Sequence, residues 1–255
     1  MIQIKGTECP RDQDFTVTAS LVKVQDFLRR LPLFRELSAK ELDSVSSGTK
    51  QFRAAAGTVL FRRGEPCLGF YFVVYGQVKV AFNESDGAEK VIEIVDANQG
   101  FGESLMFLEE PHMGFAETLS DSLLLLVGTK VLLHAIDRNP HFARSMLARL
   151  AQRLHDRIAD IEAYTLKSGA QRVVAYLLRD IPADTHSSRE VRLSTPKSVV
   201  ASRLSITREH FSRVLHQLAL AGLIHIKGRT ISVMDPGRLR LWPENHFGGP
   251  GIGVI

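Results

Sequence analysis

The 255-residue sequence contains only two cysteines, Cys9 and Cys67, and a single tryptophan. Two thiols are too few for a disulfide framework or a four-cysteine metal site, and such scarcity is typical of a reducing compartment. Long apolar runs are also absent: the longest aliphatic stretch, residues 123–127, is far too short to cross a bilayer, and residues 1–15 have no apolar core of signal-peptide length. We therefore expect a cytoplasmic protein with no membrane partner.

The chain also lacks a strong excess of charge, since 32 basic and 28 acidic residues give a net charge of +4. This excludes a highly charged disordered tail protein. The charge is unevenly distributed, however. Residues 167–255 contain 13 basic and 6 acidic residues, a net charge of +7, and the rest of the chain has a net charge of −3. A basic excess confined to the C-terminal third indicates that this part binds the phosphate backbone of a nucleic acid.

The hydrophobic pattern changes twice along the chain. After an irregular segment at residues 1–20, apolar residues at helical spacing predict a helix ending at Pro32, and Ser38 with Glu41 forms a capping-box pattern for a second helix. Residues 49–127 instead carry short Val-, Phe-, Tyr- and Ile-rich segments separated by glycines, which predicts an antiparallel β jelly roll. A parallel sheet is disfavoured because there is no room for crossover helices.

A long amphipathic helix is predicted after Pro140, with no internal glycine or proline until Gly169. Its apolar stripe consists of Leu147, Leu150, Leu154, Ile158 and Ile161. Such a stripe packs either on its own domain or on the same helix of a second copy. The length favours a second copy, because it exceeds what a small sandwich needs to cover one face.

The remaining residues predict a winged helix-turn-helix. Thr195 before Pro196 and Thr207 are expected to cap two short helices, and a β-hairpin follows around Gly228. The fold class is therefore α+β. We expect a jelly-roll sensor domain at 21–137, a dimerisation helix at 138–167, a winged helix-turn-helix at 168–242 and a flexible tail at 243–255.

The second helix of this motif presents Glu209, Ser212 and Arg213 on one face of its N-terminal half, the part that reads base edges in the major groove. Arginine can bond guanine bidentately and glutamate can accept from cytosine, whereas the alternative is an ordinary exposed i,i+4 ion pair. Residues expected to contact the DNA backbone are Lys197, Arg203, Thr207, Arg208, Lys227 and Arg229.

In this order of parts the chain resembles the CRP/FNR superfamily of bacterial transcription regulators over residues 21–240. The matching pieces are PLFRELSAKEL at 32–42, GTVLFRRGEPCLGFYFVVYGQVKV at 57–80, FGESLMFLEEP at 101–111 and the helix-turn-helix. The resemblance implies a homodimer held by the long helix, an effector-sensing β domain, double-stranded DNA and RNA polymerase as partners, and no enzymatic activity.

A finer resemblance concerns the target and the effector. The triplet of Glu209, Ser212 and Arg213 resembles the FNR-type reading head, which implies a TTGAT-N4-ATCAA palindrome. The segments ESLMFLEEPH, RLHDRIADIEAYTLKSGAQRVVAYLL and LSITREHFSRVLHQL are similar to the denitrification regulators, which implies a response to nitric oxide or redox state through heme. The effector pocket is then expected around Gly102, Glu103, Met113 and Phe115.

Chemistry separates the candidate effectors in part. Cyclic AMP is disfavoured, because no Arg or Lys lies between Gly102 and Thr118 to meet its phosphate, although Arg62 or Arg63 could supply a relocated cation. An iron–sulfur cluster is excluded, since two cysteines cannot supply four thiolates. Heme is allowed, but His134, His155 and His216 give no basis for choosing an axial ligand, and the identity of any metal stays open.

An enzyme of cupin type is the alternative from another class, because cupins share the jelly-roll shape and bind metal through clustered histidines. Residues 49–127 contain only His112, so a centre with two or three histidines cannot be built there. The sequence therefore favours a regulator over a metalloenzyme.

Overall fold

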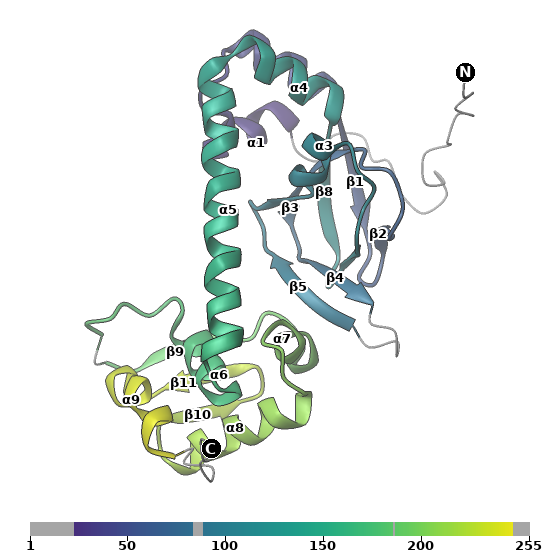
Figure 1. Ribbon diagram of the computed structural model, residues 1–255. Helices are drawn as coiled ribbons and strands as arrows, with labels where there is room; N and C mark the ends of the chain where they lie inside the picture. The colour runs from purple at the N-terminus through teal and green to yellow at the C-terminus, as the bar shows by residue number, and fades with distance from the viewer. Residues whose placement is uncertain (1–22, 84–88, 186, 247–255) are drawn as a thin grey trace, which may run out of the picture. The chain divides into compact units, whose positions relative to one another are not determined.

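The structure, a computed structural model, describes residues 23–83, 89–185 and 187–246 (Figure 1). The chain forms two compact units, residues 1–155 and 156–255, which divide within the long helix α5 (Pro140–Leu166). The expected irregular tail at 1–20 lies outside the described residues. Helix α9 (Pro236–His246) covers the first residues of the expected tail at 243–255, and the rest of that tail also lies outside.

Three short helices precede the sheets: α1 (Val24–Arg30), the 3-10 helix η1 (Pro32–Phe34) and α2 (Ala39–Ser47). The predicted capping box is confirmed, because the Ser38 hydroxyl accepts from the Glu41 amide while the Glu41 carboxylate accepts from the Ser38 amide. Two amides that lack partners within the helix are thereby satisfied, which fixes where α2 begins.

The strands of the first unit form two antiparallel four-stranded sheets, which confirms the jelly-roll prediction. One sheet has the order β1-β8-β3-β6 and the other β2-β7-β4-β5. Their bounds are β1 (Thr49–Ala54), β2 (Val59–Phe61), β3 (Gly69–Tyr75), β4 (Val78–Asn83), β5 (Glu89–Val95), β6 (Gly100–Phe101), β7 (Phe115–Thr118) and β8 (Ser122–Gly128). A core containing Tyr71, Val73, Val78, Ala116 and Leu124 fills the space between the sheets.

A second core in this unit joins the sheet to the helices. Phe70 and Phe72 of β3 pack with residues of α1, α2, α4 (Thr129–Arg138) and the first turns of α5. Phe142 of α5 is fully buried and stacks on Phe34 with ring centroids 5.7 Å apart. This contact holds the N-terminal end of α5 on the first unit.

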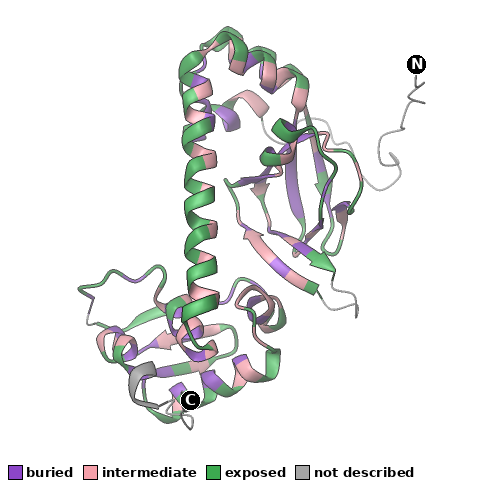
Figure 2. Cartoon of the chain, viewed as in Figure 1, coloured by how far each residue is buried: buried purple, intermediate pink, exposed green. Residues whose placement is uncertain are grey.

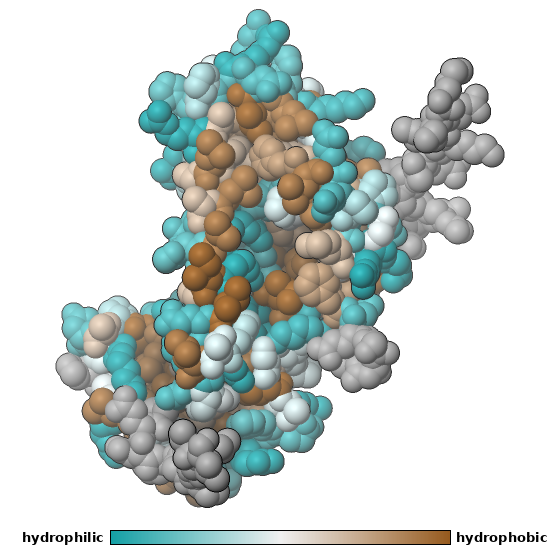
Figure 3. Space-filling view, viewed as in Figure 1, coloured by the Kyte–Doolittle hydropathy of each residue, from teal (hydrophilic) through white to brown (hydrophobic). Residues whose placement is uncertain are grey.

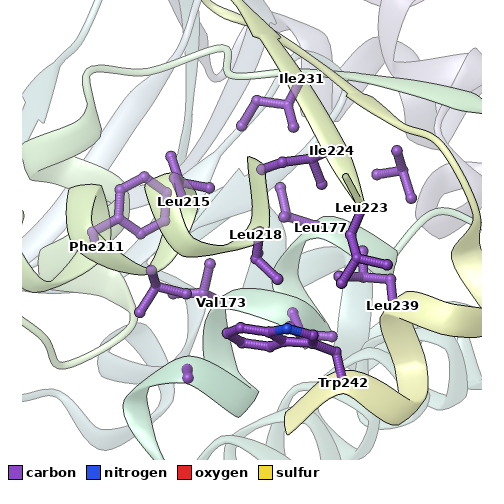
Figure 4. Packing of buried hydrophobic residues seen from close by; sticks show 14 of the residues in the cluster. Val173, Leu177, Phe211, Leu215, Leu218, Leu223, Ile224, Ile231, Leu239 and Trp242 are labelled. Atoms are coloured by element: carbon purple, nitrogen blue, oxygen red, sulfur yellow. The ribbon is translucent and has the colours of Figure 1, made fainter. Parts of the chain in front are cut away.

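The second unit is a small helical domain with a three-stranded sheet of order β10-β11-β9. Its remaining elements are α6 (Gly169–Leu178), β9 (Arg189–Arg192), α7 (Lys197–Arg203), α8 (Arg208–Leu220), β10 (Ile224–Lys227) and β11 (Thr230–Val233). Figure 4 shows its core, where Val173 of α6, Phe211 of α8, Ile231 of β11 and Trp242 of α9 point toward one another. The winged helix-turn-helix arrangement is thus confirmed.

One expected cap is wrong. Helix α7 begins after Pro196, which is itself the N-cap and offers no side-chain hydrogen bond. The hydroxyl of Thr195 is buried and makes no hydrogen bond within the described part of the chain. The proline sets the φ angle for helix entry, so α7 starts without a capping side chain.

Candidate DNA-reading surface and effector domain

Helix α8 presents a polar face that packing on its opposite side fixes in place. Its buried residues are Phe211, Val214, Leu215 and Leu218. The helix starts at Thr207, whose hydroxyl accepts from the His210 amide at 3.1 Å as predicted. Since one face is anchored in the core, the residues between the anchors must point outward.

The three expected base-reading residues lie on this outer face. Glu209 and Arg213 are exposed, and Ser212 is partly exposed. All three lie within the first two turns of α8, where a recognition helix reaches base edges. Glutamate accepts and arginine donates, so the face offers both kinds of hydrogen-bonding group to a groove.

The turn before α8 requires an unusual backbone conformation. Ser205 has a φ of 55°, in the left-handed region that glycine adopts without penalty. Its amide donates to the Ser202 carbonyl, and the amide of Ile206 donates to Ala201. The chain therefore reverses sharply between α7 and α8, as a helix-turn-helix requires.

Basic side chains flank the reading face. Arg208 at the start of α8 is exposed, as are Lys227 and Arg229 on either side of Gly228 at the tip of the β10–β11 hairpin, and Lys197 is partly exposed. Arg203 differs from these residues. Its guanidinium donates to both carboxylate oxygens of Asp160, at 2.9 and 2.8 Å.

In the first unit, Glu103 at the start of α3 (Glu103–Leu108) forms buried ion pairs with two arginines. Glu103 is 1% exposed. One of its carboxylate oxygens lies 3.0 Å from Arg149 Nε and 3.2 Å from Arg153 Nη1 of α5. Both arginines also donate to the Gly100 carbonyl, at 2.6 and 2.9 Å. The carboxylate is thereby neutralised and held against α5.

The close approach at Gly100 leaves no room for a side chain. A Cβ atom there would lie 2.8 Å from the Tyr71 carbonyl oxygen and 2.6 Å from the ring of Phe70. Arg149 in turn lies over the Phe70 ring, 5.1 Å from its centroid. Glycine at this position lets the backbone carbonyl reach the two guanidinium groups.

The sequence interpretation of the effector domain missed these two arginines. The sequence argument considered only cations between Gly102 and Thr118. The two arginines that pair with Glu103 belong to α5, more than 40 residues further along the chain. Their spacing of four residues, which places both on one helix face beside the apolar stripe, was the available signal.

The other expected pocket residues lie elsewhere. Met113 is 58% exposed. Phe115 lies under Lys79, whose ammonium is paired with Glu89 at 2.6 Å and with Glu117 at 3.5 Å. Phe115 also lines a cavity of about 340 Å³ whose lining includes Arg62 and Arg63 but not Glu103. The expected pocket at Gly102, Glu103, Met113 and Phe115 stays a prediction.

The three histidines considered as axial ligands are exposed, whereas His112 is buried. His134, His155 and His216 are exposed on helices. His112 is 2% exposed and stacks on Phe61 with ring centroids 3.5 Å apart. Burial lowers the pKa of His112 to about 4, which keeps its imidazole neutral. Within the described ranges, no group of three or more His, Cys, Asp or Glu side chains could hold a metal ion.

The outer face of α5 carries exposed apolar side chains along much of its length. Leu147, Leu154, Ile158 and Ile161 are each more than half exposed, whereas Leu150 is partly buried. Figure 2 shows most of the helix as exposed, and Figure 3 shows hydrophobic side chains gathered along it. Such a stripe is costly to leave in water.

For the residues that the structure describes, none of the helices combines the length and the apolar character needed to span a bilayer.

Comparison with known proteins gives matches to both units. The sequence family "Cyclic nucleotide-binding domain" matches residues 51–139, and "Crp-like helix-turn-helix domain" matches residues 171–242. The "Cyclic AMP receptor protein" of Thermus thermophilus is 26% identical over 208 residues, which cover 82% of this chain and 94% of that protein.

Two solved structures are similar to this chain, and the first supports the fold. FixK2 from Bradyrhizobium japonicum is 23% identical, covers 76% of this chain and 96% of its own, and has a TM-score of 0.66, which supports the fold. DNR from Pseudomonas aeruginosa is 34% identical, covers 88% of this chain and 99% of its own, and has a TM-score of 0.48.

Proposed function

The chain belongs to the CRP/FNR family of DNA-binding transcription regulators, and we propose that it acts as an effector-controlled homodimer that reads an FNR-like TTGAT-N4-ATCAA palindrome. The family consists of regulators rather than enzymes. The observation that carries the proposal is the outward face of α8, where Glu209, Ser212 and Arg213 stand free of the core. In the FNR-type reading head such a triplet reads the half-site by direct hydrogen bonds.

The proposed DNA backbone contacts are exposed or partly exposed groups around this face. Arg208, Lys197, Lys227 and Arg229 supply positive charge, and Thr207 lies at the entrance of the reading helix. These contacts fix the register of the protein on the duplex but carry no sequence information. The net charge of +7 in residues 167–255 supports this role.

A second copy of the chain is the proposed occupant of the α5 stripe. The exposed leucines and isoleucines recur along one helix face, and a parallel partner helix would remove them from water. A twofold dimer presents two reading heads, which matches a palindrome. We place the protein in the cytoplasm, with RNA polymerase as its further partner.

The proposed control is a population shift. An effector that binds the β domain of one state better than the other changes the packing of the paired α5 helices, which brings the two reading heads about one DNA turn apart. The proposed signal is nitric oxide or redox state, carried by a bound heme, and it rests on the resemblance of residues 103–112, 153–178 and 204–218 to the denitrification regulators. His134, His155 and His216 are exposed and the buried His112 is stacked on Phe61, so no step of this mechanism is assigned to heme.

A cyclic nucleotide is the second candidate effector, and one observation favours it. Arg62 and Arg63 line the cavity beside Phe115 and bring positive charge to it. Calorimetry with cyclic AMP, and a visible spectrum after heme addition with and without nitric oxide, separate the two candidates. Micromolar binding of cyclic AMP would favour the second, and a shifted Soret band the first.

An electrophoretic mobility shift assay that compares the palindrome with a scrambled duplex tests the DNA proposal. We expect the full-length chain to bind the palindrome at least a hundredfold more tightly, since specific sites exceed non-specific DNA by roughly 10³ or more at physiological salt. Equal affinity for both duplexes would contradict the proposed reading head.

A further inference from the structure

A cluster of polar side chains in the second unit ties the last turns of α5 to the helix-turn-helix. Its members are Asp160 and Tyr164 of α5, Arg172 of α6, Arg203 of α7 and Ser205 of the turn. We call this set the α5–α7 cluster. The Arg203 guanidinium donates to both oxygens of the Asp160 carboxylate, at 2.9 and 2.8 Å. This double contact is stronger and more directional than a single ion pair.

Tyr164 adds a second link to the same residue. Its hydroxyl donates to the Arg203 backbone carbonyl at 2.7 Å and accepts from Arg203 Nη1. Because one contact is to the main chain, α5 holds the end of α7 itself and not only a mobile side chain. Burial raises the pKa of Tyr164, so its hydroxyl keeps its proton at neutral pH.

Arg172 of α6 links the turn at Ser205 to Tyr164 of α5. It donates to the Tyr164 carbonyl and to the Ser205 carbonyl, each at 3.2 Å, and its guanidinium lies 5.8 Å from the centre of the Tyr164 ring. Ser205 is the residue with left-handed φ that sets the direction of the chain into α8. Three helices and the turn therefore meet through one set of hydrogen bonds.

The partial burial of these groups strengthens the cluster. The side chains of Arg203 and Asp160 are 21% and 26% exposed, which limits the screening by solvent that weakens surface ion pairs. A further arginine, Arg157, lies 3.2 Å from the Asp160 carboxylate. The guanidinium of Arg203 is thus bonded to a side chain of α5, whereas Arg208 and Arg229 are exposed at the surface.

We propose that Arg203 is a positioning residue, which with Asp160, Tyr164 and Arg172 sets the angle between α5 and the reading helix, and that it does not contact DNA phosphate. This inference rests on the proposed DNA-reading function. In a dimer joined along α5, a fixed angle between α5 and α8 determines how far apart the two reading heads lie. The α5–α7 cluster therefore determines which spacing between half-sites the protein accepts.

The direction in which Asp160→Asn changes DNA affinity distinguishes a positioning role of Arg203 from a phosphate contact. If Arg203 bound phosphate, Asp160→Asn would release its guanidinium and tighten DNA binding. If Arg203 positions the reading head, Asp160→Asn and Arg203→Gln both weaken binding. The double variant would then lose no more than either single variant, because both remove one interaction.

The experiment measures the affinity of the full-length dimer for the palindrome with spacers of three to six base pairs, for a single half-site and for scrambled DNA. For Asp160→Asn and Arg203→Gln we expect about a tenfold loss on the four-base-pair spacer, a flattened spacer preference and a change below about twofold on the half-site. The slope of log K against log salt should stay unchanged. Lys227→Gln is the control that should reduce this slope, since each lost phosphate contact removes about 0.9.

Several outcomes would overturn the inference: tighter binding by Asp160→Asn, a reduced salt slope for Arg203→Gln, or an unchanged spacer preference in both variants. Tyr164→Phe keeps the ring and removes only the hydroxyl links, so it provides the test if the charge variants fold poorly. If the parent chain bound scrambled DNA as tightly as the palindrome, the proposed sequence reading would fail. The salt slope of Arg203→Gln on scrambled DNA would still decide whether Arg203 touches phosphate.

Discussion

Glu103 and Arg149 lie 46 positions apart in the sequence and form an ion pair of 3.0 Å in which the carboxylate is almost completely buried. Arg153 completes the arrangement from the next turn of α5. A carboxylate in this position is a structural link to α5. Removal of this carboxylate should therefore lower the stability of the first unit.

Glu103→Ala is expected to destabilise the first unit by about 2 kcal/mol, because Arg149 and Arg153 lose their shared partner in a region with little solvent. Urea unfolding followed by far-UV circular dichroism measures the change. Glu110→Gln, at an exposed position, is the control and should shift the free energy of unfolding by less than about 0.5 kcal/mol. Equal stability of Glu103→Ala and the parent would mean that the ion pairs contribute nothing net.

Arg213→Ala should weaken binding to the palindrome by about 1–3 kcal/mol and relax the preference for guanine at the contacted position, because a bidentate arginine contact is lost. Competition binding with half-sites altered at one base pair measures both effects. Arg238→Ala removes another exposed arginine, in α9, and should leave the base preference intact. Base readout by Arg213 is wrong if the two variants behave alike.

The stability of the first unit should fall on acidification because of His112. The pKa of His112 is about 4 in the folded chain and near its ordinary value of 6.5 in the unfolded chain. Between these values the unfolded chain binds the proton and the folded chain does not, so stability falls as pH drops through this window. We expect a loss of about 2 kcal/mol near pH 5 relative to pH 8 from this group.

The contribution of His112 is isolated by comparing the parent with His112→Gln, which cannot titrate. The difference in unfolding free energy between the two proteins should shrink from pH 8 to pH 5, while the exposed His134→Gln control tracks the parent. A pH-independent difference would show that burial does not depress this pKa.

Leu154→Asp is expected to convert the dimer to a monomer at micromolar concentration, since it places a charge in the middle of the exposed α5 stripe. Light scattering coupled to size-exclusion chromatography gives the mass directly. His155→Asp changes the neighbouring exposed position and should leave the dimer intact. A parent chain that is monomeric would contradict the proposed role of the stripe.

Local patterns predicted most of the elements. The capping box at Ser38, the apolar stripe of α5 and the cap at Thr207 depend on residues three or four positions apart, and the structure has all three. The reading face also follows from periodicity, because the buried side of α8 determines its exposed side.

Other features depend on contacts that no local pattern contains. The pairing of Glu103 with α5 and that of Arg203 with Asp160 join residues more than 40 positions apart. Thr195 has the residue type of a helix cap, yet its side chain is buried beside the start of α7. In each case the tertiary packing, and not the preference of the residue, decides what the side chain contacts.

The position of the single tryptophan has a practical consequence. Trp242 is 6% exposed in the core of the second unit, and the chain has no other indole. Its ultraviolet emission therefore reports on the winged unit alone, while the jelly roll contributes no indole signal. A plain emission scan during denaturation would therefore follow the melting of the winged unit without labelling, and far-UV circular dichroism of the same sample would add the melting of the jelly roll.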